Sequence, residues 1–426
     1  MTKAESQFDY TDGTGLSEHY EFWRDKVLGY FEGMLSTGDY MPTQHLKHLE
    51  FFSKWIIPLL GPKPRLENGN NVLAYQSYMC DDYTPIELSM AWKSDSSKPL
   101  MRFSIEPLPQ HKPDEQRNPL QLVAYGLHVL DTFRRSFRSP SSAFSDYLVV
   151  EPSLFTNVLK SIGFTNGQHG TSIISNIFLA FDLLPCRIQL KSYCILNSAL
   201  DRGEKLTLVT KAISAHAPET AVSAMSAYFR SKPPDWHTIF SPDPCIIGVD
   251  CTCTHDARIK IYIRFQVTDF DNIVDQLSLG GRIPVSSACI DTVHDLWSRF
   301  GGHPFLCSSH TSGVLFYYDF TTIKSLPSVK VYIPVRLMAR NDQVIVDATA
   351  EWMSNHAHFS NYRQNFLRTV SDTWNDRELS HTIGTFTYVS LNAAAGAAGC
   401  HPTIYFNPMV YSRSFPSEEL VDSSPS

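Results

Sequence analysis

Hydrophobic and polar residues alternate with a period of two in several short segments of the chain. The clearest is Arg258 to Arg264, where Ile259, Ile261 and Ile263 alternate with cationic residues and Tyr262. Successive side chains of a strand point to opposite faces, so this segment predicts a strand with one apolar and one cationic face. Taken alone, the charged face is more simply explained by exposure to solvent.

Similar strand-like segments occur in pairs, and segments with helical periodicity separate the pairs. The short links within each pair predict antiparallel hairpins. Strands are predicted at residues 71–79, 85–92, 100–107, 172–184, 187–196, 244–253, 257–267, 312–320, 328–335, 381–391 and 402–407. Helices are predicted at residues 16–35, from 42 to near 61, and at 117–138, 150–162, 203–215, 217–230, 269–279, 286–300 and 341–374.

This order of elements predicts an α+β architecture. The strands either close into one antiparallel barrel with the helices outside it, or divide between two α+β domains. Closure is favoured because it removes exposed strand edges, and a barrel of about ten strands is wide enough to enclose a ligand chamber. We therefore expect a single barrel domain over residues 16–411, a flexible N-terminus at 1–15 and a disordered tail, rich in Ser and Pro, at 412–426.

Composition and charge narrow the possible partners. The net charge is −7, which argues against a nucleic-acid partner. No apolar run approaches the ~20 residues that cross a bilayer, and the polar N-terminus lacks a signal-peptide core. The nine cysteines are odd in number and scattered, as is typical of reduced thiols. We expect a cytoplasmic protein without a membrane partner, and the pattern is compatible with a homodimer.

The polar faces of the second strands of the pairs share a pattern. A lysine followed two positions later by a tyrosine occurs at Lys191/Tyr193, Lys260/Tyr262 and Lys330/Tyr332. Because the pattern repeats from pair to pair, these faces are predicted to converge in one lumen. The lumen then contains the basic residues Arg102, Lys191, Arg258, Lys260 and Lys330 and the tyrosines Tyr193, Tyr262, Tyr332 and Tyr405, whereas Arg264 either faces the lumen or lies at the rim.

Such a lumen points to a particular chemistry. Buried like charges repel, so the cluster is tolerable only where water or a polyanion fills it, and a phosphate or diphosphate is the obvious polyanion. Tyrosine rings beside it suit a carbocation, since a desolvated ring contributes up to ~2 kcal/mol of cation–π attraction. A diphosphate together with a carbocation indicates the ionisation of an allylic diphosphate.

At these residues the sequence resembles the fungal dimethylallyl-tryptophan-synthase-type aromatic (indole) prenyltransferases. The resemblance covers about residues 16–407 and rests on several short motifs in order. They are Thr84–Ser89, Met101–Pro107, Gly248–Cys251, Arg258–Tyr262, Leu279–Arg282 and Lys330–Tyr332. The resemblance implies a ten-stranded antiparallel β-barrel surrounded by α-helices and built from repeated αββα units, the ABBA prenyltransferase barrel.

The resemblance also implies roles for individual residues. Glu87 accepts a hydrogen bond from an indole N–H, and Tyr78 and Met79 contact the aromatic acceptor; alternatively, Glu87 is a buried carboxylate satisfied by its neighbours. The implied reaction is electrophilic aromatic substitution with dimethylallyl diphosphate. The diphosphate is held by Arg102, Lys191, Arg258 and Lys260, with Lys330 on the same lining, and the cation is shielded by Tyr193, Tyr262, Tyr332 and Tyr405.

Three departures from the family pattern concern the acceptor and the last hairpin. Members that use tryptophan carry an arginine for the amino-acid carboxylate where this chain has Cys245, and a lysine near Phe178. Both differences disfavour free tryptophan and favour a larger or less charged indole compound, with a phenolic or polyketide acceptor as the alternative. The segment 392–400, next to the last strand, also lacks the expected basic residue.

No metal cofactor is expected to be required, with Mg²⁺ or Ca²⁺ at most stimulatory. The acidic pairs Asp81–Asp82 and Asp269/Asp271 do not form a complete Asp-rich motif, and Asp269 is placed to cap a helix. The Cys and His residues at 251–255 lack a second cluster at zinc spacing. Two functions of other classes stay open, a non-catalytic barrel that binds an isoprenoid or aromatic compound and a phosphatase-like hydrolase.

Overall fold

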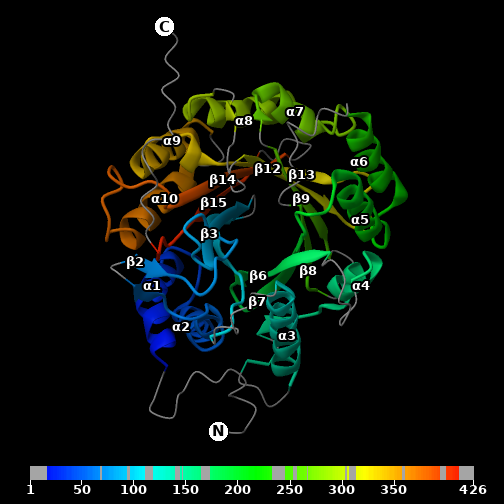
Figure 1. Ribbon diagram of the computed structural model, residues 1–426. Helices are drawn as coiled ribbons and strands as arrows, with labels where there is room; N and C mark the ends of the chain where they lie inside the picture. Colours follow the sequence, from blue (N-terminus) through cyan, green and yellow to red (C-terminus); the bar gives the residue numbers. More distant parts are fainter. Residues whose placement is uncertain are drawn as a thin grey trace.

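Helices surround a closed β-barrel in the computed structural model of the protein (Figure 1). The structure describes residues 17–67, 70–93, 96–110, 119–139, 144–145, 147–164, 173–232, 245–252, 257–265, 267–302, 305–306, 313–356, 360–393 and 400–411. Within these residues no helix combines the length and the apolar character needed to span a membrane.

Ten antiparallel strands form the barrel wall, as the sequence predicted. Their order is β7-β6-β4-β3-β15-β14-β13-β12-β9-β8, and β8 pairs back to β7, where Gly248 lies opposite Tyr193. The alternative of two α+β domains is therefore wrong. The strands are β3 (Ile86–Lys93), β4 (Ser96–Ile105), β6 (Ile174–Leu184), β7 (Arg187–Leu196), β8 (Cys245–Asp250), β9 (Ile259–Phe265), β12 (Val314–Phe320), β13 (Ser328–Ile333), β14 (Phe386–Ala393) and β15 (Pro402–Phe406).

Short strands lie outside this order. β1 (Arg65–Glu67) pairs with β2 (Asn70–Val72), β10 (Val267–Thr268) pairs with β11 (Phe305–Leu306), and β5 (Leu148–Val149) runs parallel to β7.

The predicted strand at 71–79 is wrong beyond its first two residues. The Ser77 hydroxyl and the Tyr78 N–H both donate to the buried Glu106 carboxylate, at 2.6 and 2.8 Å. A backbone amide held by a side chain is not available to a strand ladder, so β2 does not extend through this segment.

The helices pack outside the barrel in the predicted order. They are α1 (Glu18–Leu35), α2 (Pro42–Phe51), α3 (Pro119–Phe137), α4 (Ser153–Ser161), α5 (Arg202–Ser214), α6 (Glu219–Ser231), α7 (Phe270–Ser278), α8 (Ser287–Arg299), α9 (Asp342–Asn355) and α10 (Ser360–Thr373). The region 341–374, predicted as one helical stretch, therefore contains two helices. A π-helical turn (Phe52–Ile56) and a 3₁₀ turn (Ile57–Leu59) follow α2.

The hydrophobic core is a shell between the outer face of the barrel and the helices. Ile259 and Ile261 of β9 are fully buried in it, which confirms the apolar face predicted from their alternation. The rings of Phe103 and Phe181 stack at 4.7 Å between centroids, and Phe52 packs edge-on against Phe103. Each such side chain contributes roughly 1.5–3 kcal/mol through burial. The polar faces of the strands consequently point into the barrel.

Candidate active site

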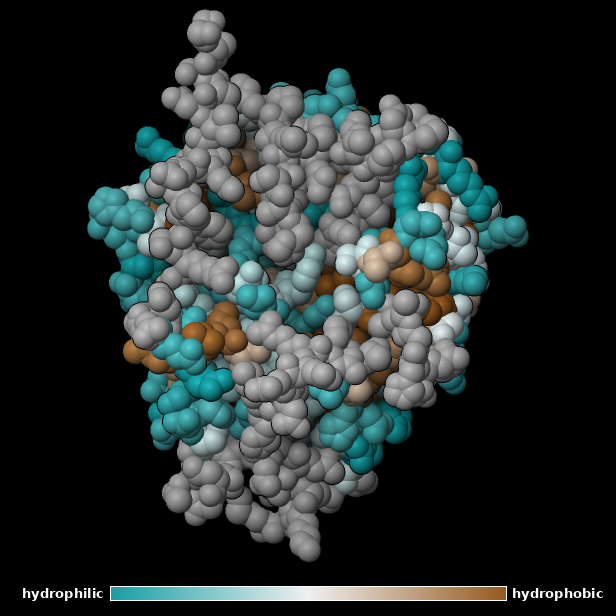
Figure 2. All heavy atoms as spheres, viewed as in Figure 1, coloured by the Kyte–Doolittle hydropathy of each residue, from teal (hydrophilic) through white to brown (hydrophobic). Residues whose placement is uncertain are grey.

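The interior of the barrel is a chamber of about 560 Å³. Seen in the direction of Figure 1, the centre of the molecule is recessed, and both hydrophilic and hydrophobic residues border the recess (Figure 2). Every predicted site residue lines this chamber: Tyr78, Met79, Glu87, Arg102, Lys191, Tyr193, Arg258, Lys260, Tyr262, Lys330, Tyr332 and Tyr405. Arg264, predicted to face the lumen or to lie at the rim, is also among the residues that line the chamber.

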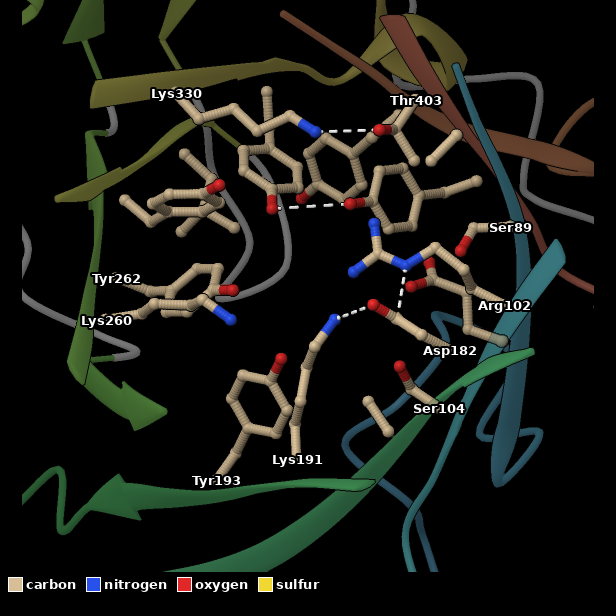
Figure 3. Close-up of a pocket in the computed structure, with 18 of the residues that line it drawn as sticks. Ser89, Arg102, Ser104, Asp182, Lys191, Tyr193, Lys260, Tyr262, Lys330 and Thr403 are labelled. Atoms are coloured by element: carbon tan, nitrogen blue, oxygen red, sulfur yellow. Dashed lines mark hydrogen bonds and ion pairs between the residues drawn. The ribbon is translucent and has the colours of Figure 1, made fainter. Parts of the chain in front are cut away.

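Asp182 and Asp250 hold four of the predicted cations. Asp182 of β6 binds the Arg102 guanidinium at 2.7 Å and the Lys191 ammonium at 2.5 Å (Figure 3). These partners stand on neighbouring strands, and Arg102 lies directly opposite Asp182 in the register of β4 and β6. Burial raises the pKa of Asp182, but the charges of Arg102 and Lys191 outweigh it and hold the pKa well below its usual value.

Asp250, on another strand of the chamber wall, is likewise bound by one arginine and one lysine. Asp250 of β8 binds Arg258 at 2.7 Å and Lys260 at 2.5 Å. Arg258 also lies 3.5 Å from Asp319 of β12. The charges of Lys260 and Arg258 overcome burial and lower the pKa of Asp250.

Lys330 differs from the other cations. Its ammonium donates to the Thr403 hydroxyl at 2.7 Å, and it has no ion pair among the residues that the structure describes (Figure 3). Burial and four neighbouring cations lower its pKa well below the usual value. Burial and Arg102 lower the pKa of Lys191 in the same direction despite its aspartate partners. Among the described residues, the five predicted cations outnumber the three aspartates beside them, Asp182, Asp250 and Asp319. This end of the chamber is therefore suited to an added anion.

The predicted tyrosines form a continuous layer beside the cations. The ring of Tyr262 lies 5.9 Å from that of Tyr193 and 6.1 Å from that of Tyr332. Tyr332 lies 5.4 Å from Tyr405, whose hydroxyl donates to the Tyr332 hydroxyl at 3.3 Å. Burial raises the pKa of Tyr193 and Tyr332 well above the usual value, so these rings carry neutral phenols.

Two further tyrosines belong to this layer but were not predicted. Tyr317 of β12 lies 5.1 Å from Tyr262, and Tyr388 of β14 lies 6.1 Å from Tyr332, between ring centroids. The period-two test identifies Tyr317, because Leu315, Tyr317 and Asp319 alternate with apolar residues on the first strand of the fourth pair. The same test applied to first strands identifies Asp182 and Asp250.

Gly248 provides the space for one side of the layer. It faces the chamber on β8, and a Cβ atom there would lie 2.5 Å from a ring carbon of Tyr193. The ring of Tyr193 therefore lies against the bare backbone of β8. Any side chain at this position would displace the ring.

Glu87 lies on β3 and faces the chamber. Its carboxylate accepts a hydrogen bond from the Thr387 hydroxyl at 2.8 Å. Burial raises the pKa of Glu87 to about 7, although Thr387, Arg336 and Arg264 act in the opposite direction. A carboxyl group with such a pKa is a candidate proton or hydrogen-bond acceptor near neutral pH.

The positions of Cys245 and Phe178 refine the view of the acceptor side. Cys245 points away from the chamber into the space between β8, α5 and α6, and its neighbour Ile246 lines the chamber instead. The expectation that Cys245 faces the acceptor is therefore wrong, because strand alternation turns it outward. Phe178 does line the chamber, and its ring lies 6.4 Å from that of Tyr78.

The acidic residues considered as metal ligands have other partners. Asp81 pairs with Arg336, and Asp82 accepts hydrogen bonds from Thr84 and Asn407. Asp269 caps α7 by accepting from the Asn272 N–H, as predicted. Within the described ranges no group of three Cys, His, Asp or Glu residues is arranged to hold a metal ion. Residues 253–256 lie outside those ranges.

Comparisons with known proteins identify the family. Residues 19–368 match the model of the tryptophan dimethylallyltransferase family. The chain is 25% identical to a 4-O-dimethylallyl-L-tyrosine synthase of Claviceps purpurea, over 93% of this chain and 90% of that protein. It is 26% identical to a 7-dimethylallyltryptophan synthase of Aspergillus fumigatus, over 92% and 85%, and 25% identical to xanthone prenyltransferase A of Emericella nidulans, over 84% and 85%.

Solved structures share the fold. The crystal structure of AnaPT from Neosartorya fischeri superposes with a TM-score of 0.72 at 19% identity, over 92% of this chain and 94% of that one. NotF in complex with brevianamide F and DMSPP gives a TM-score of 0.69 at 18% identity, over 96% and 99%. With the family model matching most of its length and the ABBA barrel as its fold, the chain belongs to the tryptophan dimethylallyltransferase family of aromatic prenyltransferases.

Proposed function

We propose that this protein transfers a dimethylallyl group from dimethylallyl diphosphate to an indole-containing small molecule other than free tryptophan, without a required metal ion. The observation that carries the proposal is the set of groups that one chamber brings together. A layer of neutral tyrosine rings, a cluster of cations and the Glu87 carboxyl all line it. Each part serves one stage of the reaction.

The cation cluster binds the diphosphate of the donor. Arg102, Lys191, Arg258, Lys260 and Lys330 donate hydrogen bonds and positive charge to its oxygens. Asp182 and Asp250 hold Arg102, Lys191, Arg258 and Lys260 in place before the donor arrives, so little reorganisation of these four is needed on binding. The same charges stabilise the diphosphate as the allylic C–O bond breaks. Cationic side chains thus perform the neutralisation that Mg²⁺ performs in other diphosphate sites.

The tyrosine layer protects the dimethylallyl cation. Its rings present π faces, each of which contributes on the order of 1–2 kcal/mol of attraction to a desolvated cation. Because burial keeps the phenols protonated, they are weak nucleophiles, and the packed rings exclude water. The cation therefore survives until the acceptor ring attacks it, forming the new C–C bond with loss of a ring proton.

Glu87 activates the acceptor. Its carboxylate accepts a hydrogen bond from the indole N–H and so raises the electron density of the ring. Tyr78 and Met79 hold the ring on the same side of the chamber. Ile246 and Phe178 present apolar surface there, which supports an acceptor that is larger or less charged than tryptophan.

A phenolic acceptor is the second candidate. A carboxylate at Glu87 accepts a hydrogen bond from a phenol O–H as readily as from an indole N–H. The named relatives also include enzymes for tyrosine and for xanthones. Both candidates use the same donor and the same cation cluster.

An acceptor panel tests the proposal. The protein is incubated with dimethylallyl diphosphate in EDTA and with indoles, cyclic dipeptides, phenols and free amino acids, the last because Arg264 places a cation in the chamber. We expect an indole compound to gain one prenyl unit by mass spectrometry. Donor binding without any product would favour the non-catalytic barrel, release of dimethylallyl alcohol alone would favour a hydrolase, and activity only after addition of Mg²⁺ would contradict metal independence.

A further inference from the structure

Strand β14 contains a β-bulge at the acceptor side of the chamber. Its register with β15 shifts between Phe386 and Val389, so one extra residue is accommodated there. As a result two consecutive residues serve the chamber: Tyr388 lines it, and the hydroxyl of Thr387 donates to Glu87. Regular alternation would turn one of the two outward. The acceptor side therefore depends on the bulge keeping its shape.

Arg336 holds this bulge from outside the strand. It lies in a 3₁₀ turn (Val335–Leu337) that follows β13, and it is 7% exposed. Its Nη1 donates to the carbonyl oxygen of Thr387 at 3.1 Å. Its guanidinium carbon lies 4.9 Å from the ring centre of Tyr388. One side chain thus contacts both residues that the bulge brings to the chamber.

The same guanidinium also holds the segment that carries Tyr78 and Met79. Its Nη2 donates to Asp81 at 3.1 Å, and its Nε binds the other carboxylate oxygen. A two-point contact between a guanidinium and a carboxylate fixes orientation as well as distance. Segment 78–82 and strand β14 are far apart in sequence, and Arg336 joins them at the point where both face the acceptor.

We propose that Arg336, together with Asp81, is a positioning residue that fixes the acceptor against the tyrosine layer and so determines acceptor affinity and the ring atom that is alkylated. The inference rests on the proposed function. Among the described residues, the side chains assigned to the diphosphate bind groups other than Asp81. Lys330 donates to Thr403, and the other four cations pair with Asp182, Asp250 and Asp319.

Arg377 offers a matched control for a role in folding alone. It too is a largely buried arginine that pairs with a neighbouring carboxylate, Asp376, at 3.1 Å and donates to a backbone carbonyl, that of Pro408, at 3.2 Å. It lies over the rings of Tyr30 and Trp374, which do not line the chamber. Loss of Arg377 therefore removes similar contacts away from the acceptor.

The test compares R336Q, R336K, D81N and R377Q. For R336Q we expect kcat/KM for the acceptor to fall by about tenfold or more and the ratio of product isomers, measured by NMR, to change. The Kd for inorganic diphosphate, measured by calorimetry, should stay within about twofold. R336K should recover part of the loss, since lysine keeps the positive charge but cannot make the two-point contact of a guanidinium. D81N should resemble R336K. R377Q should lower Tm while preserving the isomer ratio.

Hydrogen exchange supplies a readout that does not need turnover. In R336Q and R336K, exchange should accelerate in 78–82 and 386–389 and stay unchanged in β6 and β7. R336K carries the comparison if R336Q does not fold. An unchanged isomer ratio with unchanged exchange would overturn the inference, as would an equal shift of the isomer ratio in R377Q. Failure of the wild-type protein to prenylate any acceptor would instead reject the proposed function, and the exchange data alone would then decide the role of Arg336.

Discussion

Glu87 is a carboxyl group whose surroundings oppose its charge. Burial raises its pKa to about 7, and the nearby arginines reduce this rise without cancelling it. The proposed reaction needs the carboxylate, because only that form accepts the acceptor's hydrogen bond with full strength. Its function and its contribution to stability therefore respond to pH in opposite directions.

For wild-type protein we expect kcat/KM for the acceptor to rise with pH through about 7 and then to level off. E87Q should lack this rise and be slower by about 10²-fold or more, as for loss of a general base.

The same carboxyl group affects stability. Below the unfolded-state pKa of Glu87, both the folded and the unfolded state are protonated. Above it the folded state alone keeps the proton until about pH 7, so rising pH destabilises the fold across this interval. E87Q should consequently be more stable at pH 8, by up to about 3 kcal/mol. A pH–rate profile tests the predicted rise in kcat/KM, and urea unfolding tests the predicted difference in stability. Equal stability of wild-type protein and E87Q at pH 8 would contradict the stability prediction.

Lys330 leads to a prediction about protons. Burial and neighbouring cations lower its pKa, and an anion placed beside it acts in the opposite direction. Binding of dimethylallyl thiolodiphosphate at pH 8, where the phosphates are already ionised (second pKa about 6), should therefore take up a proton from solution. Calorimetry in two buffers of different ionisation enthalpy measures this uptake. Lys330→Met should reduce it and weaken binding by about tenfold or more, whereas unchanged uptake would place the proton on another group, such as Lys191.

At the level of elements, the second strands of the pairs place side chains on the chamber at the same two positions. Lys191 and Tyr193, Lys260 and Tyr262, and Lys330 and Tyr332 all face the chamber, as their alternation predicts. On β15 the corresponding residues are Thr403 and Tyr405, preceded by His401, which also lines the chamber. The last hairpin therefore brings a histidine to the wall directly after the segment 392–400, which contains no lysine or arginine.

Strand periodicity indicates the face that each aspartate takes, but it does not indicate which cation lies opposite. Arg102 lies opposite Asp182, Lys191 opposite Asp250 and Lys260 opposite Asp319. These pairings depend on register between strands that are far apart in sequence. Period two predicts which face a residue takes, but only register predicts its neighbour across the ladder. The β14 bulge was missed for a related reason, since one extra residue interrupts the alternation that a sequence search relies on.

Gly248→Ala tests how β8 supports the tyrosine layer. The new methyl group would meet the Tyr193 ring at 2.5 Å and force it to move. We expect the fraction of donor lost as dimethylallyl alcohol to rise by about fivefold or more, because water then reaches the cation. The alcohol and the prenylated product are quantified by gas and liquid chromatography. Gly29→Ala is the control: its Cβ meets nothing within 4 Å in α1, so it should stabilise by about 1 kcal/mol and leave the product ratio unchanged.

For the whole molecule, the recurrence of strand pairs and helix pairs predicted the barrel because every element agreed with one closed arrangement. Closure was the decisive physical argument, and β8 pairing with β7 confirms it. The strand predicted at 71–79 does not form beyond Val72, because Glu106, which follows β4, accepts hydrogen bonds from the Ser77 hydroxyl and the Tyr78 N–H. Its apolar and polar pattern contains no sign of that distant partner.

The shell-shaped hydrophobic core has a consequence for how such an enzyme changes over time. In most globular proteins the centre is the hydrophobic core that stabilises the fold, so substitutions there often cause unfolding. Here the stabilising apolar layer encircles the barrel, and the residues that line the central chamber contribute to binding and catalysis more than to stability. Substitutions on the chamber face can therefore accumulate while the architecture persists. The relatives named for tyrosine, tryptophan and xanthone substrates are each only 25–26% identical to this chain. Such divergence is expected where the apolar shell maintains the fold and the chamber residues are free to vary.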